Sequence, residues 1–283
     1  MAIVSMNDLL KPAFKERYGV AAFNIINDVS MLAVLKAAEE LNSPVIIQVS
    51  VKTVKYWGAK MIQYMFSEMA KGVSIPATLH LDHCPYPEVI KECLNAGWNS
   101  VLYDGSSVSF TECMQKTKEI VKMAHDMGAT VEGEVEAVKG VEDGIGSDDD
   151  GPIIPLEQAV QFINETGIDC FAPAIGTAHG TYKGEPVINS ARVSEIIAAV
   201  KIPLVLHGGT GLSQKVFTDL INRGMAKVNI STQLKIEYAD SLNKYLSAKP
   251  HEYNPIKLID ASLLGMKDMV KGFIKIFGSE GKA

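Results

Sequence analysis

The chain of 283 residues carries 27 lysines and arginines against 33 aspartates and glutamates, a formal net charge of −6. This negative balance argues against nucleic acid or an anionic membrane surface as the main partner. With 47% hydrophobic and 21% charged residues the chain is not disordered, and no apolar run approaches the roughly 20 residues that span a bilayer.

Short apolar runs with the pattern of buried strands alternate with helical stretches along almost the whole chain. Several of the runs are rich in β-branched residues, as expected for strands buried on both faces. Helical spacing of apolar residues is found in Val29–Leu41, Ser109–Met127 and Leu156–Thr166. The eight strand runs are Gly19–Asn24, Val45–Ser50, Ala77–Asp82, Ser100–Asp104, Thr130–Glu134, Cys170–Ala174, Pro203–His207 and Lys227–Ile230.

Eight strands alternating with helices over about 250 residues predict an α/β fold, a (β/α)8 TIM barrel, with residues 1–283 as one domain. A doubly wound open sheet is the alternative, but it more often has a G-x-G-x-x-G turn after its first strand. Here that strand ends Ala22-Phe23-Asn24-Ile25. Two segments break the alternation: a long acidic loop over Val135–Pro152, expected to be functional, and the tail after Pro250. The tail predicts a C-terminal helical arm with a final helix over Leu264–Phe277.

The cysteines and the N-terminal segment bear on the cellular compartment. Cys84, Cys93, Cys113 and Cys170 form no C-x-x-C pair, and a fold of this size needs no disulfides. The first 20 residues lack the basic-then-apolar layout of a secretory signal. We therefore expect a cytoplasmic protein with reduced thiols.

Histidines gather where the strands of a barrel would end. In a TIM barrel the loops after the strands carry the active site, and four of the six histidines fall at or near this face. His83, His179 and His207 can converge there as a three-nitrogen zinc site with one position open for substrate. One such histidine alone is more often an ordinary hydrogen-bonded residue, but three beside carboxylates favour a metal. Strict strand alternation would turn His83 away from the side of Asp82.

Two segments after the last two strands suit a phosphate group. The glycines of Gly208–Gly211 let backbone N–H groups approach an anion, and Asn229–Thr232 opens a helix whose N-terminus favours negative charge. TIM barrels often bind phosphate in this place. The alternative is two ordinary turns with a Ser/Thr helix cap. Lys183, close to Gly180, would add positive charge.

These residues, in this order, resemble the class II, zinc-dependent fructose- and tagatose-bisphosphate aldolase family. The resemblance spans nearly the whole chain, from Phe23-Asn24 through His80–His83, Gly176–Gly180 and Leu206–Gly211 to Lys227–Ile230. It implies a TIM barrel that reversibly cleaves a ketose 1-phosphate into dihydroxyacetone phosphate and an aldehyde.

The resemblance also implies the metal ligands. His83, His179 and His207 match the ligands of the catalytic Zn2+. Asp104 and Glu134 match positions that hold a second or displaced metal in part of the family. A monovalent cation, Na+ or K+, is bound near the substrate phosphate in such enzymes.

Catalytic and substrate-binding residues follow from the same resemblance. Asp82 matches the carrier of the C4 hydroxyl proton, and Glu142 matches a mobile-loop glutamate proposed to move a proton at C3. A class I aldolase would instead use a Schiff-base lysine; Lys227 is the only candidate, and its family match is to a structural position. The positions that match substrate and phosphate contacts are Asn24, Ser50, Gly180, Lys183, Gly208, Gly209, Thr210, Asn229, Ile230, Ser231 and Thr232.

The chain departs from the family pattern where the C4–C6 half of the sugar should lie. Family members usually carry Asp-Pro-Arg-Lys in the C-terminal arm, whose arginine reaches the 6-phosphate, typically in a neighbouring subunit. Here the stretch is Asn254–Lys257, with Ile256 in place of that fork-shaped donor. Ser107 replaces a histidine, and Glu136 and Lys139 replace two glycines of the mobile loop.

These departures predict an aldehyde half other than glyceraldehyde 3-phosphate. A sulfonate at C6 is one candidate: 6-deoxy-6-sulfofructose 1-phosphate would give sulfolactaldehyde, with Lys52, Thr53 and Ser107 around the sulfonate. The alternative is an ordinary fructose-1,6- or tagatose-1,6-bisphosphate aldolase in which Lys257 or Lys52 takes the 6-phosphate.

Two hypotheses from other classes remain beside the aldolase. The first is a non-catalytic partner subunit, which would leave unexplained why the chain keeps Asp82, His83, His179 and His207. The second is a zinc hydrolase, which would leave the two phosphate segments unexplained. The family's arm often completes a neighbour's site, so we also expect a homodimer or homotetramer.

Overall fold

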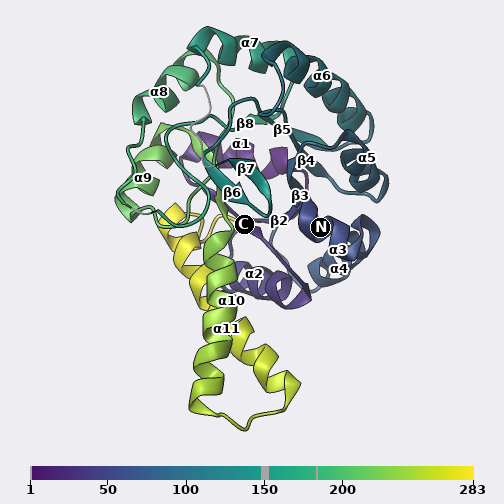
Figure 1. The fold of residues 1–283 in the computed structure, drawn as a ribbon, viewed down its shortest axis with the longest axis vertical. Helices are drawn as coiled ribbons and strands as arrows, with labels where there is room; N and C mark the ends of the chain where they lie inside the picture. Colours follow the sequence, from purple (N-terminus) through teal and green to yellow (C-terminus); the bar gives the residue numbers. More distant parts are fainter. Residues whose placement is uncertain (1, 148–152, 183) are drawn as a thin grey trace.

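Eight parallel strands close into a barrel in the computed structural model, which describes residues 2–147, 153–182 and 184–283 (Figure 1). Their order around the barrel is β1-β10-β9-β8-β5-β4-β3-β2. This closure confirms the predicted (β/α)8 TIM barrel and excludes the open sheet. The strands are β1 (Val20–Asn24), β2 (Val45–Ser50), β3 (Ala77–Cys84), β4 (Ser100–Asp104), β5 (Thr130–Glu134), β8 (Cys170–Phe171), β9 (Leu204–Leu206) and β10 (Met225–Ile230).

Helices surround the barrel, and most of them bury an apolar face against the strands (Figure 1). Their starts follow local capping chemistry: at α2 the Asn27 side chain accepts a hydrogen bond from the N–H of Ser30 at 3.0 Å. The helices are α1 (Met6–Glu16), α2 (Asp28–Glu40), α3 (Val51–Trp57), α4 (Ala59–Ala70), α5 (Pro87–Asn95), α6 (Phe110–Asp126), α7 (Leu156–Thr166), α8 (Ser190–Ala199), α9 (Gln214–Arg223), α10 (Thr232–Ala248) and α11 (Pro255–Phe277).

Helix α1, which the strand–helix alternation did not predict, closes one end of the barrel. Its buried residues Met6, Leu9, Leu10 and Ala13 share a core cluster with inward residues of the strands, such as Val205. Because apolar side chains fill this end, polar chemistry is confined to the carboxyl ends of the strands.

Several element boundaries differ from the sequence expectation, and two of the differences have clear local reasons. Strand β8 ends at Phe171 rather than Ala174, because Pro173 has no N–H for the ladder. Helix α11 starts at Pro255 rather than Leu264: Asn254 caps it by accepting from the N–H of Ile256 at 3.0 Å, and proline suits the first helical position.

The C-terminal arm and the acidic loop are the two additions to the barrel. Helices α10 and α11 form a hairpin that projects away from the barrel, as the predicted arm (Figure 1). The acidic loop contains a β-hairpin of β6 (Gly140–Glu142) and β7 (Ile145–Ser147), which overlies the barrel in Figure 1. The rest of the predicted loop, residues 148–152, lies outside the described residues.

No helix in the described part of the chain is long and apolar enough to cross a membrane. The four cysteines are buried and free, as the sequence predicted. The compartment stays a prediction.

Candidate functional site

The site depends on a break near the end of strand β3. His83 has a φ of 43°, in the left-handed region that non-glycine residues rarely adopt. The pairing of β3 with β4 also shifts between Leu81 and Cys84. The break turns the His83 ring into the barrel, where its centroid lies 4.8 Å from that of His179 and 4.6 Å from that of His207.

Three histidines and two carboxylates form the predicted metal cluster. The ligand atoms of His83, His179 and His207 lie within 4.8 Å of one another, and those of His83, Asp104 and Glu134 do so too. Nε2 of His83 and Nδ1 of His207 are buried without a hydrogen-bond partner among the described residues. Buried polar atoms normally have partners, so this nitrogen and carboxylate set fits a divalent ion such as Zn2+.

Burial and the neighbouring carboxylates set the charges of these rings. Burial, together with the nearby His83 ring, holds the pKa of His179 and of His207 well below the usual value, so both are neutral. Burial also lowers the pKa of His83, but the carboxylates of Glu134 and Asp82 raise it more, and the net pKa is well above the usual value. Burial raises the pKa of Glu134 to about 8. The metal-free cluster therefore holds protons that an ion must displace.

Glu132, which the sequence analysis did not assign to the site, orients His207 from within the barrel. His207 Nε2 lies 2.7 Å from Glu132 Oε1, and Lys227 Nζ donates to Oε2 at 2.7 Å. His80 Nε2 lies 3.5 Å from the same Oε2, and all these side chains are buried. Fixing Nε2 on a carboxylate leaves Nδ1 of His207 for an ion, as is common beside metal-bound histidines. The ion pair of Lys227 supports its predicted structural role.

Asp82, the predicted proton carrier, is held by two amide side chains. Asn24 Nδ2 donates to one carboxylate oxygen at 2.8 Å, and Asn229 Nδ2 lies 3.5 Å from the other. Gln48 in turn donates to Asn24 Oδ1 at 2.7 Å, and Ser50 lies beside Asp82 in the β2–β3 register. Asn24 and Asn229, predicted to contact substrate, therefore contact Asp82.

The predicted phosphate segments line one small pocket beside the histidines. Gly208 has a φ of 69°, and a Cβ there would lie 2.5 Å from the carbonyl oxygen of Ala178, so only glycine fits. Helix α10 begins at Thr232, which lines this pocket, so the positive end of the helix faces it. The N–H of Gln233 donates to the Thr210 hydroxyl at 3.3 Å. Ile230 does not line it, and its side chain lies behind Gly209. The lining residues are His179, Gly180, Gly208, Gly209, Thr210, Asn229, Ser231 and Thr232.

Tyr182 joins the two loops of this pocket. Its hydroxyl accepts from the N–H of Ala178 at 3.0 Å and donates to the carbonyl of Gly208 at 2.7 Å. The sequence analysis assigned no role to Tyr182. Lys183, predicted to add charge here, lies outside the described residues.

A second cleft, of about 470 Å3, opens beside the loops that follow β1 and β2. Lys52 and Thr53 line it, as predicted for the C6 group, together with Lys235 and Asp143, which were not predicted. Ser107 is exposed in the turn after β4 and does not line this cleft.

The arm residues do not line this cleft, whereas the predicted loop glutamate directly precedes Asp143, which does. Glu142 belongs to β6, directly before the hairpin turn, and its side chain is outside the described part. Ile256 and Lys257 lie at the tip of the arm, where Lys257 Nζ pairs with Glu252 at 2.8 Å. Within one chain Lys257 therefore does not line the site.

Glu136, which replaces a family glycine, fastens the acidic loop instead of facing the sugar. The residue is buried, and its carboxylate pairs with Arg192 Nη2 at 2.5 Å. It also accepts from the N–H groups of Ile154 and Ala174, each at 2.9 Å.

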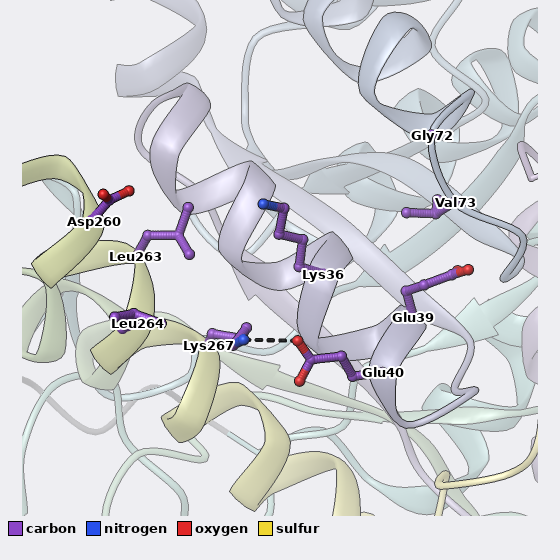
Figure 2. Close-up of a pocket in the computed structure, with 9 residues that line it drawn as sticks. All are labelled: Lys36, Glu39, Glu40, Gly72, Val73, Asp260, Leu263, Leu264 and Lys267. Carbon is purple, nitrogen blue, oxygen red and sulfur yellow. Dashed lines mark hydrogen bonds and ion pairs between the residues drawn. The ribbon is translucent and has the colours of Figure 1, made fainter. Parts of the chain in front are cut away.

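Another cleft, of about 540 Å3, lies between α2 and α11 (Figure 2). Three of its charged groups pair with neighbours: Lys267 Nζ lies 2.7 Å from Glu40, and Glu39 accepts from the N–H of Ser74 at 2.8 Å. The cleft lies by the C-terminal end of α2 and the turn before β3, toward the amino ends of the strands. It is therefore separate from the histidine cluster.

Comparisons with known proteins agree with this geometry. The family described as fructose-bisphosphate aldolase class-II matches residues 4–282. The chain is 36% identical over 284 residues to a sulfofructosephosphate aldolase of Alkalicoccus urumqiensis, covering 100% of this chain and 99% of that protein. It is 37% identical over 288 residues to a fructose-bisphosphate aldolase of Geobacillus stearothermophilus, with the same coverage. The crystal structure of the YdjI aldolase from Escherichia coli K12 has a TM-score of 0.87 and 31% identity, covering 99% of both chains.

Zinc binding to the metal-free protein should release at least one proton at pH 7. The raised pKa of His83 means that its ring is protonated there, and a protonated ring cannot ligate. Zinc affinity should accordingly fall as the pH is lowered. Titration calorimetry in buffers of different ionisation enthalpy measures the proton count. The Glu134→Gln protein, in which a carboxylate beside His83 is gone, should release fewer protons; binding with no proton release would contradict this charge assignment.

Lys227→Met should lower the free energy of unfolding of the metal-free protein by about 3–5 kcal/mol, because Glu132 would remain as an unpaired buried charge. The double variant Lys227→Met/Glu132→Gln should lose less unfolding free energy than Lys227→Met alone, because it leaves no unpaired buried charge. Lys60→Met, at an exposed lysine of α4, is the control and should change little. Urea unfolding measures these three variants and the Glu132→Gln single variant. A double variant whose loss of unfolding free energy equals the sum of the losses of its two single variants would refute the pairing.

Proposed function

Because this chain belongs to the class II fructose-bisphosphate aldolase family, we propose that it cleaves a ketose 1-phosphate that carries a sulfonate at C6. The products would be dihydroxyacetone phosphate and sulfolactaldehyde. The observation that carries the reaction is the convergence of His83, His179 and His207 beside Asp82 and the glycine-lined pocket. Residues 1–283 would act as one catalytic domain.

The metal would be held by His83, His179 and His207, with Asp104 and Glu134 as the carboxylates next to it. Zn2+ bound there would act as a Lewis acid that stabilises negative charge on the ketone half during cleavage. Glu132 would hold the His207 ring in the ligating orientation. The family's monovalent cation, Na+ or K+, would lie near the phosphate pocket.

Asp82 would act as the base for the C4 hydroxyl. The carboxylate takes the hydroxyl proton, the C3–C4 bond breaks, and C4 becomes the aldehyde carbon. The electron pair of that bond stays on the dihydroxyacetone phosphate half, where C3 takes up a proton, a step we assign to Glu142. Asn24 and Asn229 fix the orientation of Asp82 through their amide groups.

The glycine-lined pocket would hold the 1-phosphate. Backbone N–H groups around Gly208 and Gly209 would supply donors, and the N-terminus of α10 would add its positive end. Tyr182 would keep the two loops at a fixed separation. Anchoring one end of the sugar orients C3 and C4 at the base.

The sulfonate proposal rests on what replaces the family's arginine. Ile256 cannot bind an anion, and a sulfonate carries one charge where a phosphate carries about −1.5 to −2 at pH 7. Lys52 and Thr53 line the cleft next to the site and suit this smaller charge. One relative is named a sulfofructosephosphate aldolase, and another at nearly the same identity a fructose-bisphosphate aldolase.

We further propose that the protein forms a dimer or tetramer of identical chains through its arm. Tyr253 and Ile256 near the arm tip are 79% and 63% exposed, although both are large and apolar. A second copy of the chain would cover them.

The preferred substrate should be 6-deoxy-6-sulfofructose 1-phosphate, with kcat/KM at least about tenfold above that for fructose 1,6-bisphosphate or tagatose 1,6-bisphosphate. Dihydroxyacetone phosphate release is coupled to an NADH-dependent reductase. EDTA should abolish the activity and zinc should restore it, and the Asp82→Asn protein is the inactive control. A preference for either bisphosphate would refute the sulfonate at C6. A chain that neither binds zinc nor turns over any of the sugars would favour a partner subunit, whereas zinc binding without turnover would point to an aldehyde half that is not among the three substrates.

The double variant Tyr253→Asp/Ile256→Asp should sediment as a monomer, whereas the native protein should sediment as a dimer or tetramer. Met127→Asp is the matched control, because Met127 is an exposed apolar residue outside the arm. Sedimentation velocity compares all three proteins, and a native monomer would contradict the proposed assembly.

A further inference from the structure

One of the two lysines in the cleft of about 470 Å3, proposed above to hold the C6 group, is already in an ion pair. Asp143 lies in the turn of the β6–β7 hairpin with a φ of 51°, and its Oδ1 lies 2.8 Å from Nζ of Lys235 on α10. Burial raises the pKa of Asp143, but hydrogen bonds from Lys235 and Ser50 and the charge of Lys52 lower it more. An ionised carboxylate thus sits between the groups that would hold an incoming anion.

Lys235 also belongs to the helix turn that borders the phosphate pocket. Helix α10 begins at Thr232, which lines that pocket, and Lys235 follows three residues later, on the same side of the helix. Lys235 itself lines the neighbouring cleft with Lys52. One turn of α10 therefore faces both clefts, and Ser50 and Asp82 lie in register beside them. A sugar with an anion at each end fits across this arrangement.

We propose that Lys235 selects for an anion at C6, and that Asp143 is a resident carboxylate which the substrate's C6 anion displaces. The inference rests on the proposed function only in that the substrate carries an anion at C6, whether sulfonate or phosphate. Asp143 directly follows Glu142, so its displacement frees the hairpin turn next to the glutamate assigned to C3. Binding of the substrate's C6 anion is thereby linked to release of the β6–β7 hairpin.

If Asp143 and the C6 anion compete for Lys235, the two single variants should change the Kd in opposite directions. Lys235→Gln removes the positive charge and should raise the Kd for the C6-anionic sugar about tenfold. Asp143→Asn removes the competing carboxylate and should lower that Kd, by about threefold. In the double variant the effect of Asp143→Asn should disappear, because the two substitutions act on one charge. If the ion pair only stabilises the hairpin, both single variants should weaken binding.

Equilibrium binding measures these shifts without turnover. Titration calorimetry uses the zinc-loaded full chain with Asp82→Asn in every variant, and three sugars: 6-deoxy-6-sulfofructose 1-phosphate, fructose 1,6-bisphosphate and fructose 1-phosphate. The last has a hydroxyl at C6, and its Kd should respond far less to Lys235→Gln. Lys244→Gln, at an exposed lysine further along α10, is the matched control and should leave every Kd unchanged.

The outcomes separate this inference from the proposed substrate. A Kd that rises in Lys235→Gln and falls in Asp143→Asn, for both C6-anionic sugars, supports the displacement of Asp143. Tighter binding of fructose 1,6-bisphosphate than of the sulfonate sugar would refute only the sulfonate preference. Kd changes of the same sign in Lys235→Gln and Asp143→Asn would overturn the displacement. So would Kd changes for fructose 1-phosphate as large as those for the C6-anionic sugars.

Discussion

The left-handed backbone at His83 is the constraint on which the rest of the site depends. Strand alternation puts Asp82 on the inner side of β3 and the next residue on the outer side. A positive φ at a non-glycine residue costs of order 1–3 kcal/mol, and here it brings His83 into the barrel beside His179 and His207. The proposed proton carrier and one of the proposed metal ligands thus come from consecutive residues, which would place the base next to the ion.

The barrel supports this strained segment with a buried polar layer. The Glu132 carboxylate is hydrogen-bonded to Lys227 and His207. His80 lies between Glu132 and Ser100, and its Nδ1 is 2.8 Å from the Ser100 hydroxyl. Such a layer is costly to bury and is retained where it fixes side-chain orientation. Below it the apolar contacts of α1 close the barrel. Rigid groups therefore hold the reacting atoms, and the β6–β7 hairpin is the addition that lies across them.

Local pattern was enough for much of the fold and for the central residues of the site. Short β-branched runs predicted the strands because both faces of a parallel barrel strand are buried. Position at strand ends predicted that His83, His179 and His207 converge, and glycine content predicted the segments that line the small pocket beside them. The backbone break at His83 was not predictable, since no residue type marks it. The helix α1 lies before the first strand–helix unit, so the alternation held no signal for it.

Residues that act through tertiary contacts were the ones missed. In the sequence Glu132 is a carboxylate inside a predicted strand, and only the folded structure shows that Lys227 and His207 contact it. Lys235 lies on a helix with ordinary spacing, and Asp143 in an acidic loop of many carboxylates; only the closure of the chain brings them together. Conversely, Ser107 and Glu136 replace family residues near the site in sequence, yet Ser107 is exposed and Glu136 is buried against Arg192.

The central claim is that the break at His83 assembles a metal site from three imidazoles. X-ray absorption at the zinc edge of the reconstituted protein tests it most directly, because it counts the ligands around the ion. We expect one zinc per chain with nitrogen and oxygen neighbours only, three of them imidazoles at about 2.0–2.1 Å. A His83→Ala protein should lose one imidazole and bind zinc more weakly. Sulfur ligands, or an unchanged zinc environment in His83→Ala, would contradict the account.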